Sequence, residues 1–210
     1  MVLKLIGLDL KKSLDKNALL MGFFGLVFTY LSSFSLEKDT SLSRLMGTEG
    51  LAILFLIFAL EFSKGTLQED KARKKIEFVL ANGLGIKFLV IKYFGAIYLA
   101  SLLTLLPAFI FFVFKTRIGV FEIFNFLLTS GLYTIFLILK ILNTGNMNKM
   151  AGLQNKIILL GVLILMVSIN IYIFTSMIKL YLISKFLILF AINIFVALRT
   201  NKERIGVTYF

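Results

Sequence analysis

Long apolar runs recur along the whole chain, and they limit it to very few folds. A helix needs about 20 predominantly apolar residues to cross a bilayer, and a chain inside lipid must satisfy its own backbone hydrogen bonds. The runs therefore predict an all-α membrane protein with six transmembrane helices. They are expected at residues 18–34, 45–60, 88–114, 121–142, 156–174 and 180–198.

Two parts of this scheme have more than one interpretation. The clean apolar run at 51–60 is too short to cross a bilayer, so the second helix is expected to begin near Leu45 and to include Glu49. A re-entrant hairpin is the alternative there. The link at 175–185 is either a tight turn or a short amphipathic or re-entrant element, and in the second case the last span begins near Phe186.

Composition supports a single transmembrane domain over residues 1–210. The chain is 59% hydrophobic and has a mean hydropathy of +0.95, whereas a soluble domain is about 45–50% apolar. No polar segment is long enough to build a soluble core. The absence of Cys and His excludes disulfides, thiolate or imidazole metal sites, and catalysis by those groups. We expect no enzyme activity in the chain itself.

The distribution of positive charge predicts the topology. The formal net charge is +12, and the basic residues gather at the ends of the spans. This pattern favours membrane topology and anionic lipid over nucleic acid as its explanation. With six spans, 17 of the 23 Lys and Arg residues fall on the side that carries both termini. We therefore expect a multi-pass protein of the cell membrane with both termini in the cytoplasm.

The first 17 residues have the pattern of an amphipathic helix. At 100° per residue, one side collects Leu3, Ile6, Gly7, Leu10 and Leu14. The other side collects Lys4, Lys11, Lys12, Asp15 and Lys16. We expect residues 1–17 to form a helix that lies in the membrane surface with its basic side toward lipid headgroups. An ordinary basic lead-in to the first span is the alternative.

Polar residues inside the spans are few. Three asparagines are expected to hydrogen-bond to neighbouring helices rather than to a substrate: Asn125, Asn170 and Asn193. Three lysines are expected to extend to the membrane surface: Lys92, Lys140 and Lys185. Because these charges can leave the apolar region, an ion-coupled transporter is disfavoured. Pro107 removes one backbone donor and is expected to kink the third span.

Residues 64–87 form the longest charged segment, and we expect them to lie in the cytoplasm. Thr66 and Glu69 have the spacing of a capping box, and Asn82-Gly83 supplies a left-handed stop. The interval predicts one helix of about four turns. It would place Ile76 and Val79 on one side and Phe78 on another, so that one side packs on the bundle and the other docks a partner. A solvated helix without a partner is the alternative.

The same residues resemble the permease subunit of an ABC transporter of the second exporter type, the ABC type-2 family. That family has a pattern close to Thr-Ile-Glu-x-Leu-Leu-Ala-x-Pro-x-Ser between spans 2 and 3, followed by a lysine. The matching stretch here is 75–85, which reads KIEFVLANGLG, and Lys92 is near the family lysine. Lys75, Gly83 and Gly85 replace the family's Thr, Pro and Ser.

The resemblance implies a mechanism and a set of partners. Two permease subunits, identical or different, would pair with two separate ATPase subunits that bind ATP and magnesium. The chain itself would bind no cofactor, in agreement with its lack of a Walker loop. The segment would act as a coupling helix between spans 2 and 3 that contacts the ATPase. The contact residues implied are Glu69, Ile76, Glu77, Phe78, Val79, Leu80 and Leu84.

Two functions follow as hypotheses. The first is an ATP-driven exporter of an amphipathic substrate such as a peptide, a lipid or a hydrophobic drug, because the spans are apolar and aromatic-rich with few charges. The second is a membrane scaffold or immunity protein that transports nothing and holds a cytoplasmic partner through the same helix. An adjacent gene for an ATPase would favour the first.

Overall fold

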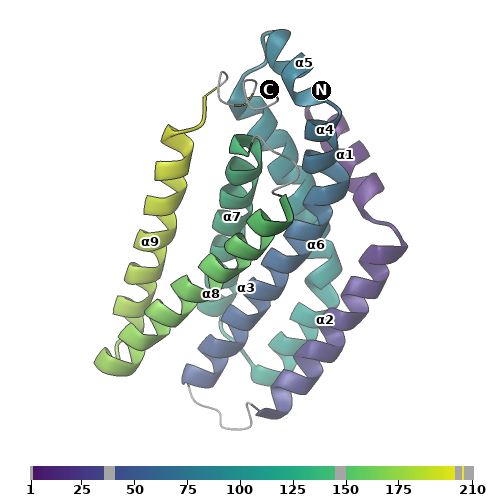
Figure 1. Cartoon of the computed structure of the whole chain (residues 1–210). Coiled ribbons are helices and arrows are strands. Elements are labelled where there is room, and N and C mark those ends of the chain that lie inside the picture. The colour runs from purple at the N-terminus through teal and green to yellow at the C-terminus, as the bar shows by residue number, and fades with distance from the viewer. Residues whose placement is uncertain (1, 36–40, 145–149, 202–204, 206–210) are drawn as a thin grey trace. The chain divides into compact units, whose positions relative to one another are not determined.

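The chain is helical throughout the part that the computed structural model describes, which is residues 2–35, 41–144, 150–201 and 205 (Figure 1). No strand occurs among these residues. The helices are α1 (Val2–Ser13), α2 (Lys16–Ser35), α3 (Ser41–Ser63), a π-helical turn (Lys64–Gln68), α4 (Glu69–Ala72), α5 (Lys75–Ala81), α6 (Ile86–Thr116), α7 (Val120–Asn143), α8 (Met150–Thr175) and α9 (Ile178–Leu198).

Five helical stretches are long and apolar enough to cross a membrane. They are Ser43–Ala72, Ile86–Thr116, Val120–Asn143, Gly152–Thr175 and Ile178–Leu198. A sixth candidate arises only if Leu3–Ser13 and Asn17–Leu31, which are bent by 72° at their junction, count as one span. The all-α fold is therefore confirmed for the described residues, its five long apolar helices are consistent with a multi-pass membrane protein, and the count of six spans stays a prediction.

Both ambiguous parts of the span scheme have a definite structure. α3 runs without a break from Ser41, so the re-entrant hairpin is wrong and the helix begins four residues before Leu45. α9 begins at Ile178 directly after a two-residue link, so residues 175–185 contain a tight turn. Ser176 makes that turn in the left-handed region with φ 54°, and its N–H donates to the Tyr172 carbonyl at 2.7 Å.

The expected helix over residues 1–17 is shorter than predicted. α1 ends at Ser13, and Asp15 begins a new helix instead of continuing the first. The Asp15 Oδ1 atom accepts hydrogen bonds from the backbone N–H groups of Asn17 at 2.9 Å and Ala18 at 3.2 Å. A short acidic side chain at this position caps a helix N-terminus. The position of α1 in the membrane surface stays a prediction, and Met1 lies outside the described residues, as do Lys38, Lys149, Lys202 and Arg204 from the charge distribution.

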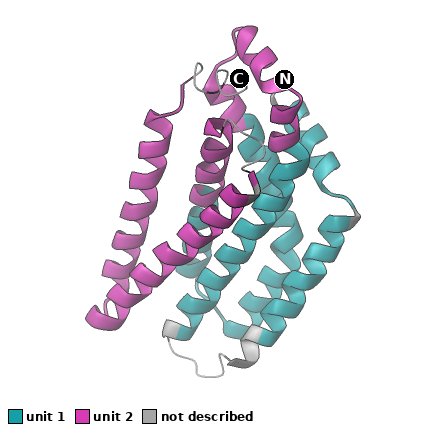
Figure 2. Ribbon diagram, in the orientation of Figure 1, with its two compact units in different colours: residues 1–66, 92–131 teal, residues 67–91, 132–210 magenta. Residues whose placement is uncertain are grey.

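Contacts divide the chain into two compact units (Figure 2). Unit 1 is residues 1–66 and 92–131, and unit 2 is residues 67–91 and 132–210. Unit 1 has an aromatic core in which the Phe55 ring lies 5.3 Å from that of Tyr98 and 6.1 Å from that of Phe126. The Phe109 ring stacks on Phe126 at 4.7 Å between centroids. Such aromatic contacts add about 0.5–1.5 kcal/mol each beyond burial.

Small residues allow α2 to approach its neighbours closely in unit 1. Ala18, Gly25 and Thr29 are buried, and Gly22 lies between them at helical spacing. A Cβ atom on Gly22 would lie 3.1 Å from the Thr104 carbonyl oxygen of α6. Small side chains at helical spacing are typical of close packing between membrane helices. The signal is present in the sequence, because Ala18, Gly22, Gly25 and Thr29 follow one another at intervals of three or four residues.

The asparagines inside the spans behave in two ways. Asn125 Nδ2 donates to Glu49 Oε1 of α3 at 3.2 Å in unit 1. Asn193 Nδ2 donates to the Leu132 carbonyl of α7 at 3.3 Å in unit 2. These two interhelical bonds confirm the expectation. Asn170 is exposed and donates to a carbonyl of its own helix, Met166, so the expectation is wrong for it.

The lysines expected at the membrane surface also differ from one another. Lys92 pairs with Asp9 of α1 at 3.1 Å and lies 4.4 Å from the centroid of the Tyr93 ring. Lys185 is fully buried in α9, and its Nζ lies over the rings of Tyr181 and Phe186. Extension to the surface is therefore wrong for Lys185, because aromatic faces stabilise the cation where it is.

Candidate functional site

The candidate site is the segment that connects α3 to α6, and it does not begin with a helix cap. Thr66 lies in the π-helical turn that continues α3, and its hydroxyl donates to the Phe62 carbonyl at 2.8 Å. Gln68 precedes α4 without a side-chain capping bond. The predicted capping box is wrong, because a box needs the free N–H groups of a helix start. Here the helix has already begun at Ser41.

A break at Arg73 and Lys74 divides the predicted four-turn helix into α4 and α5. Lys74 adopts the left-handed region with φ 58°, which stops α4 and turns the chain. Glu69 of α4 pairs with Arg73 in the break at 2.6 Å, and Asp70 of α4 pairs with Lys75 of α5 across it at 3.1 Å. Glu69 therefore contacts the turn instead of reaching back to Thr66. Exposed pairs of this kind contribute little stability.

Lys71 is buried, and it joins α4 to the C-terminus of α7 within unit 2. Its Nζ donates to the carbonyls of Ile141 at 2.8 Å and Leu142 at 2.6 Å. The last carbonyls of a helix lack N–H partners and carry partial negative charge. A buried ammonium group satisfies both needs, so Lys71 holds α4 in place.

From the sequence, Lys71 was only one of the charged residues of segment 64–87, and this role was not predicted. The pattern that could have identified it is the helical spacing of Ser63, Leu67 and Lys71, all of which are buried. Each of these residues follows the last by four positions, so they lie on one side of a continuous helix. The sequence prediction placed the start of a separate helix at Thr66, and so it missed that the helix continues from α3 into α4.

α5 presents its predicted contact residues in different directions. Ile76 is buried, with 1% of its surface exposed, so it anchors α5 from within. Phe78 is 72% exposed. Val79, Leu80 and Leu84 are half-buried. The prediction that Ile76 and Phe78 point to different sides is confirmed, and of the two only Phe78 is open to a partner.

Glu77 lies partly inside the segment. It is half-buried, and its Oε1 atom is enclosed without a hydrogen-bond partner. Its charge acts on the Lys71 ammonium group. The carboxylate therefore neutralises part of the buried positive charge from the α5 side, and it is less available to a partner than Phe78.

The predicted stop after α5 is confirmed. Gly83 has φ 83°, and its N–H donates to the Leu80 carbonyl at 3.2 Å. The Leu84 N–H donates to the Val79 carbonyl at 3.3 Å. This pair of bonds is a Schellman motif, which requires a left-handed residue at the position of Gly83. α6 then begins at Ile86, so α5 has a short connection at both ends.

The exposed side chains of α5 and its N-terminal turn form one surface, which we call the α5 surface. It consists of Lys74, Lys75, Phe78, Ala81 and Asn82. An aromatic side chain beside two lysines suits a partner that offers an apolar pocket next to acidic groups. Within the described ranges no group of three or more Asp, Glu, His or Cys residues is placed to hold a metal ion. The chemistry of the segment is that of binding.

The fold and this segment define a class, which is a helical multi-pass membrane protein with a short structured connection between its second and third long helices. Comparisons of the chain with protein-family models, with curated proteins and with solved structures found no match. The resemblance to ABC type-2 permeases therefore rests on the residues of the sequence and stays a prediction.

Proposed function

We propose that the chain is the membrane-spanning permease subunit of an ATP-driven ABC exporter. It would lie in the cell membrane with both termini in the cytoplasm, pair with a second permease subunit, and dock onto two separate ATPase subunits. The substrate class that fits the apolar helices is an amphipathic molecule. The observation that carries the proposal is that Phe78 is exposed on α5. Buried Ile76 anchors α5, and Lys71 holds the preceding α4 in place.

The connections of α5 support a coupling role. α5 follows α4 after a two-residue turn, and α4 continues α3 without a separate helix start. Three residues after Gly83, the chain enters α6. A partner that moves Phe78 would therefore act on both long helices through short links, and on the α7 C-terminus through Lys71. A flexible loop would lose such a displacement in its own motion.

The test is capture of partners by the tagged chain, from which an ABC ATPase subunit should co-purify. Phe78→Ala should reduce the recovery of the ATPase about ten-fold or more, because a buried aromatic anchor contributes about 2 kcal/mol or more to an interface. Phe114→Ala is the matched control, since Phe114 is 79% exposed and lies at the far end of α6. Equal recovery with both variants would contradict the docking role of α5.

A captured partner without nucleotide-binding motifs would instead support the scaffold or immunity function. ATP hydrolysis by the purified complex separates the two functions further. In an exporter, hydrolysis responds to the permease and falls in Phe78→Ala. In a scaffold, hydrolysis is absent or does not change with that variant.

The topology has an independent test because the chain contains no cysteine. A single cysteine at Lys74, on the α5 surface, should react with a membrane-impermeant maleimide only after the cells are opened. A single cysteine at Val120, which is 84% exposed at the start of α7, should react in intact cells. The reverse pattern would place α5 outside the cytoplasm and exclude an ATPase as its partner.

A further inference from the structure

α8 is the least buried of the five long apolar helices in the described part of the chain (Figure 1). It belongs to unit 2, where α9 packs beside it. Only 22% of its most apolar stretch is buried, compared with 72% for α7. Its buried side includes Ile157, Gly161 and Ile164, and the Gly161 carbonyl accepts a hydrogen bond from the Tyr133 hydroxyl at 3.3 Å. The opposite side of α8 is exposed.

The exposed side of α8 has the spacing of a coiled-coil interface. One row of exposed residues, which we call the α8 seam, advances by four and three positions in turn through three heptads. The row consists of Gly152, Lys156, Leu159, Leu163, Met166, Asn170 and Ile173. The other exposed residues between Gly152 and Phe174 border this row, and they are Asn155, Val167 and Phe174. A repeat of 3.5 residues suits a left-handed pair of helices, which is the commonest arrangement in membrane bundles.

Asn170 is a polar group within the apolar part of the α8 seam. The other seam residues from Leu159 to Ile173 are apolar, and the apolar run continues past Asn170 through residues 171–174. Its Nδ2 atom donates to the Met166 carbonyl at 2.9 Å, and among the described residues this is the one hydrogen bond of its side chain. A carboxamide has a second N–H and an oxygen that also form hydrogen bonds. Lipid tails cannot supply these bonds, so another polar group in the membrane is needed.

The exposed side of α9 shows that spacing alone does not define an interface. It has a row with the same alternating intervals, in which every residue is apolar: Leu180, Ile183, Leu187, Phe190, Ile194 and Ala197. Lys185 and Asn193, which lie away from the ends of α9, are both buried. Lipid can cover the α9 row without leaving a polar group unpaired. The α8 seam differs because it presents a carboxamide.

We propose that the α8 seam is the interface between two copies of this chain. The charge distribution gives every copy the same orientation in the membrane, so the two α8 helices run parallel and each seam residue meets its counterpart. Asn170 of one copy donates its remaining N–H to the carboxamide oxygen of Asn170 in the other. A carboxamide is complementary to a second carboxamide because it is both donor and acceptor. A single asparagine in such a row also fixes the register of the two helices.

The charge in the α8 seam does not oppose this pairing. Lys156 is its one charged residue, and it lies before the apolar run that begins at Ile157. A lysine at the end of a membrane helix extends to the lipid headgroups, where its counterpart in the second copy is kept apart from it. The inference rests on the proposed function only for the pairing of two permease subunits, and it specifies that the two are identical. The α5 surface takes no part in it.

Cysteine cross-linking tests the α8 seam directly, because the chain contains no cysteine. Single-cysteine variants of the full-length protein are oxidised in the membranes of the cells that produce them. Met166→Cys and Ile173→Cys, on either side of Asn170 in the seam, should give disulfide-linked dimers. Leu187→Cys is the matched control, since Leu187 lies in the α9 row and is 64% exposed, compared with 56% for Met166. It should cross-link about ten-fold less or weaker, because a disulfide requires Cα atoms within about 7 Å.

The role of the carboxamide is tested by dimerisation in liposomes. Energy transfer between labelled copies is measured as the ratio of protein to lipid is raised. Asn170→Leu should raise the ratio at half-dimerisation about five-fold, which corresponds to about 1 kcal/mol. Asn170→Gln keeps a carboxamide and should leave this ratio within about two-fold of the original. Asn170 is exposed, so neither substitution removes packing within its own chain.

Two results would overturn the proposal. One is equal cross-linking of Met166→Cys and Leu187→Cys, and the other is a half-dimerisation ratio that Asn170→Leu does not move. A chain that stays monomeric, or that pairs only with a different permease subunit, would also overturn it. The proposed function is decided separately, by capture of an ATPase through Phe78, because dimerisation in liposomes is measured without that partner.

Discussion

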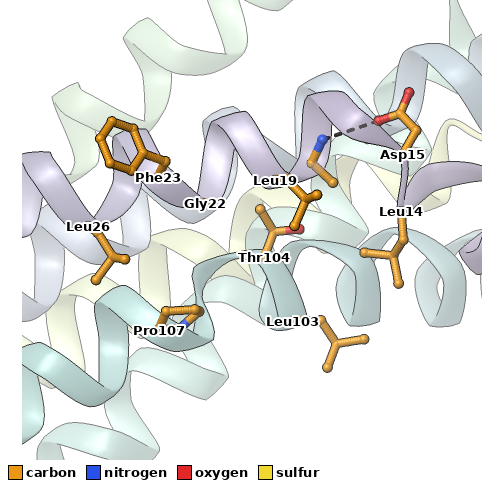
Figure 3. A pocket seen from close by; sticks show the side chains of 10 residues that line it. Leu14, Asp15, Leu19, Gly22, Phe23, Leu26, Leu103, Thr104 and Pro107 are labelled. Atoms are coloured by element: carbon orange, nitrogen blue, oxygen red, sulfur yellow. Dashed lines mark hydrogen bonds between the residues drawn. The ribbon is translucent and has the colours of Figure 1, made fainter.

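The C-terminus of α7 and the proline turn of α6 present the same chemical problem with different outcomes. At both places, the regular helical pattern of backbone hydrogen bonds is interrupted, by the end of a helix or by a proline. At the end of α7, Lys71 donates to the carbonyls of Ile141 and Leu142. At Pro107, Leu103 and Thr104 line a cavity of about 650 Å³ (Figure 3), and the buried Thr104 hydroxyl has no hydrogen-bond partner among the described residues.

The difference shows that one chain can contain both a segment fixed by buried hydrogen bonds and a region where the helices leave open space. A buried cation that donates to two carbonyls holds its segment in one position, because moving it would break both hydrogen bonds and leave a buried charge without them. Beside Pro107 the buried Thr104 hydroxyl makes no hydrogen bond within the described residues, and the neighbouring space is open and mostly apolar. In the proposed exporter, the first arrangement would serve coupling.

The largest expected effect comes from removing the Lys71 ammonium group, which donates to the carbonyls at the end of α7. Lys71→Met keeps the length of the side chain but removes two hydrogen bonds from a charged donor. Each is worth about 1.5–3 kcal/mol, so we expect the free energy of unfolding to fall by about 4 kcal/mol. The measurement is a detergent-induced unfolding titration in bicelles. Lys87→Met is the control, since Lys87 is exposed at the start of α6. Similar curves for the two variants would contradict the assigned role of Lys71.

The next effect tests whether α5 is anchored through its buried side. Ile76→Ala should cost about 3 kcal/mol, in the range for a fully buried aliphatic side chain. Ile91→Ala is the matched control, because Ile91 also belongs to unit 2 but is 58% exposed. The same titration measures both. A loss for Ile76→Ala no greater than for the control would mean that Lys71 alone holds the segment.

A smaller effect is expected from a substitution at Gly22, where α2 packs closely against α6. Gly22→Ala would place a Cβ atom 3.1 Å from the Thr104 carbonyl oxygen. Backbone at this distance cannot yield as a flexible side chain would, so we expect a loss of about 1–3 kcal/mol. Gly50→Ala in α3 has nothing within 4 Å of the new Cβ and should gain about 0.5–1 kcal/mol through helix propensity. Equal changes in the two variants would show that α2 does not pack closely at Gly22.

The smallest expected effect on the free energy of unfolding is for the α5 surface, which takes part neither in the Lys71 contact nor in the region around Pro107. Phe78→Ala should change the free energy of unfolding by less than about 0.5 kcal/mol, as is usual for exposed positions. Its effect should appear only in the recovery of a partner. A loss above about 1 kcal/mol, which is typical of a residue with packing contacts, would mean that Phe78 packs within the protein and would remove the support for docking.

Local patterns predicted much of the fold. The apolar runs located α6, α7 and α9 to within two residues at each end, because hydropathy and length act over one segment at a time. The stop at Asn82-Gly83 was predictable for a similar reason, since the left-handed preference of glycine is a property of its own backbone.

Predictions that required knowledge of distant neighbours were less accurate. Thr66 and Glu69 have the spacing of a cap, but the preceding helix had already supplied the partners that a cap provides. Lys185 was expected to leave the apolar region, and instead it lies over two aromatic rings of its own helix. The helix break at Lys74 had no clear signal, because lysine rarely adopts a positive φ.

By itself, the sequence determined that this protein is a set of apolar helices joined by short links, with a charged segment that ends at Gly83. The tertiary structure decided what its polar groups do. Lys71 and its acceptors are 70 and 71 positions apart in the chain, and Thr104 is distinguished only by the bond that it does not make. Helix formation depends on neighbours along the chain, whereas the satisfaction of a buried polar group depends on which atoms the packed helices bring within about 3 Å.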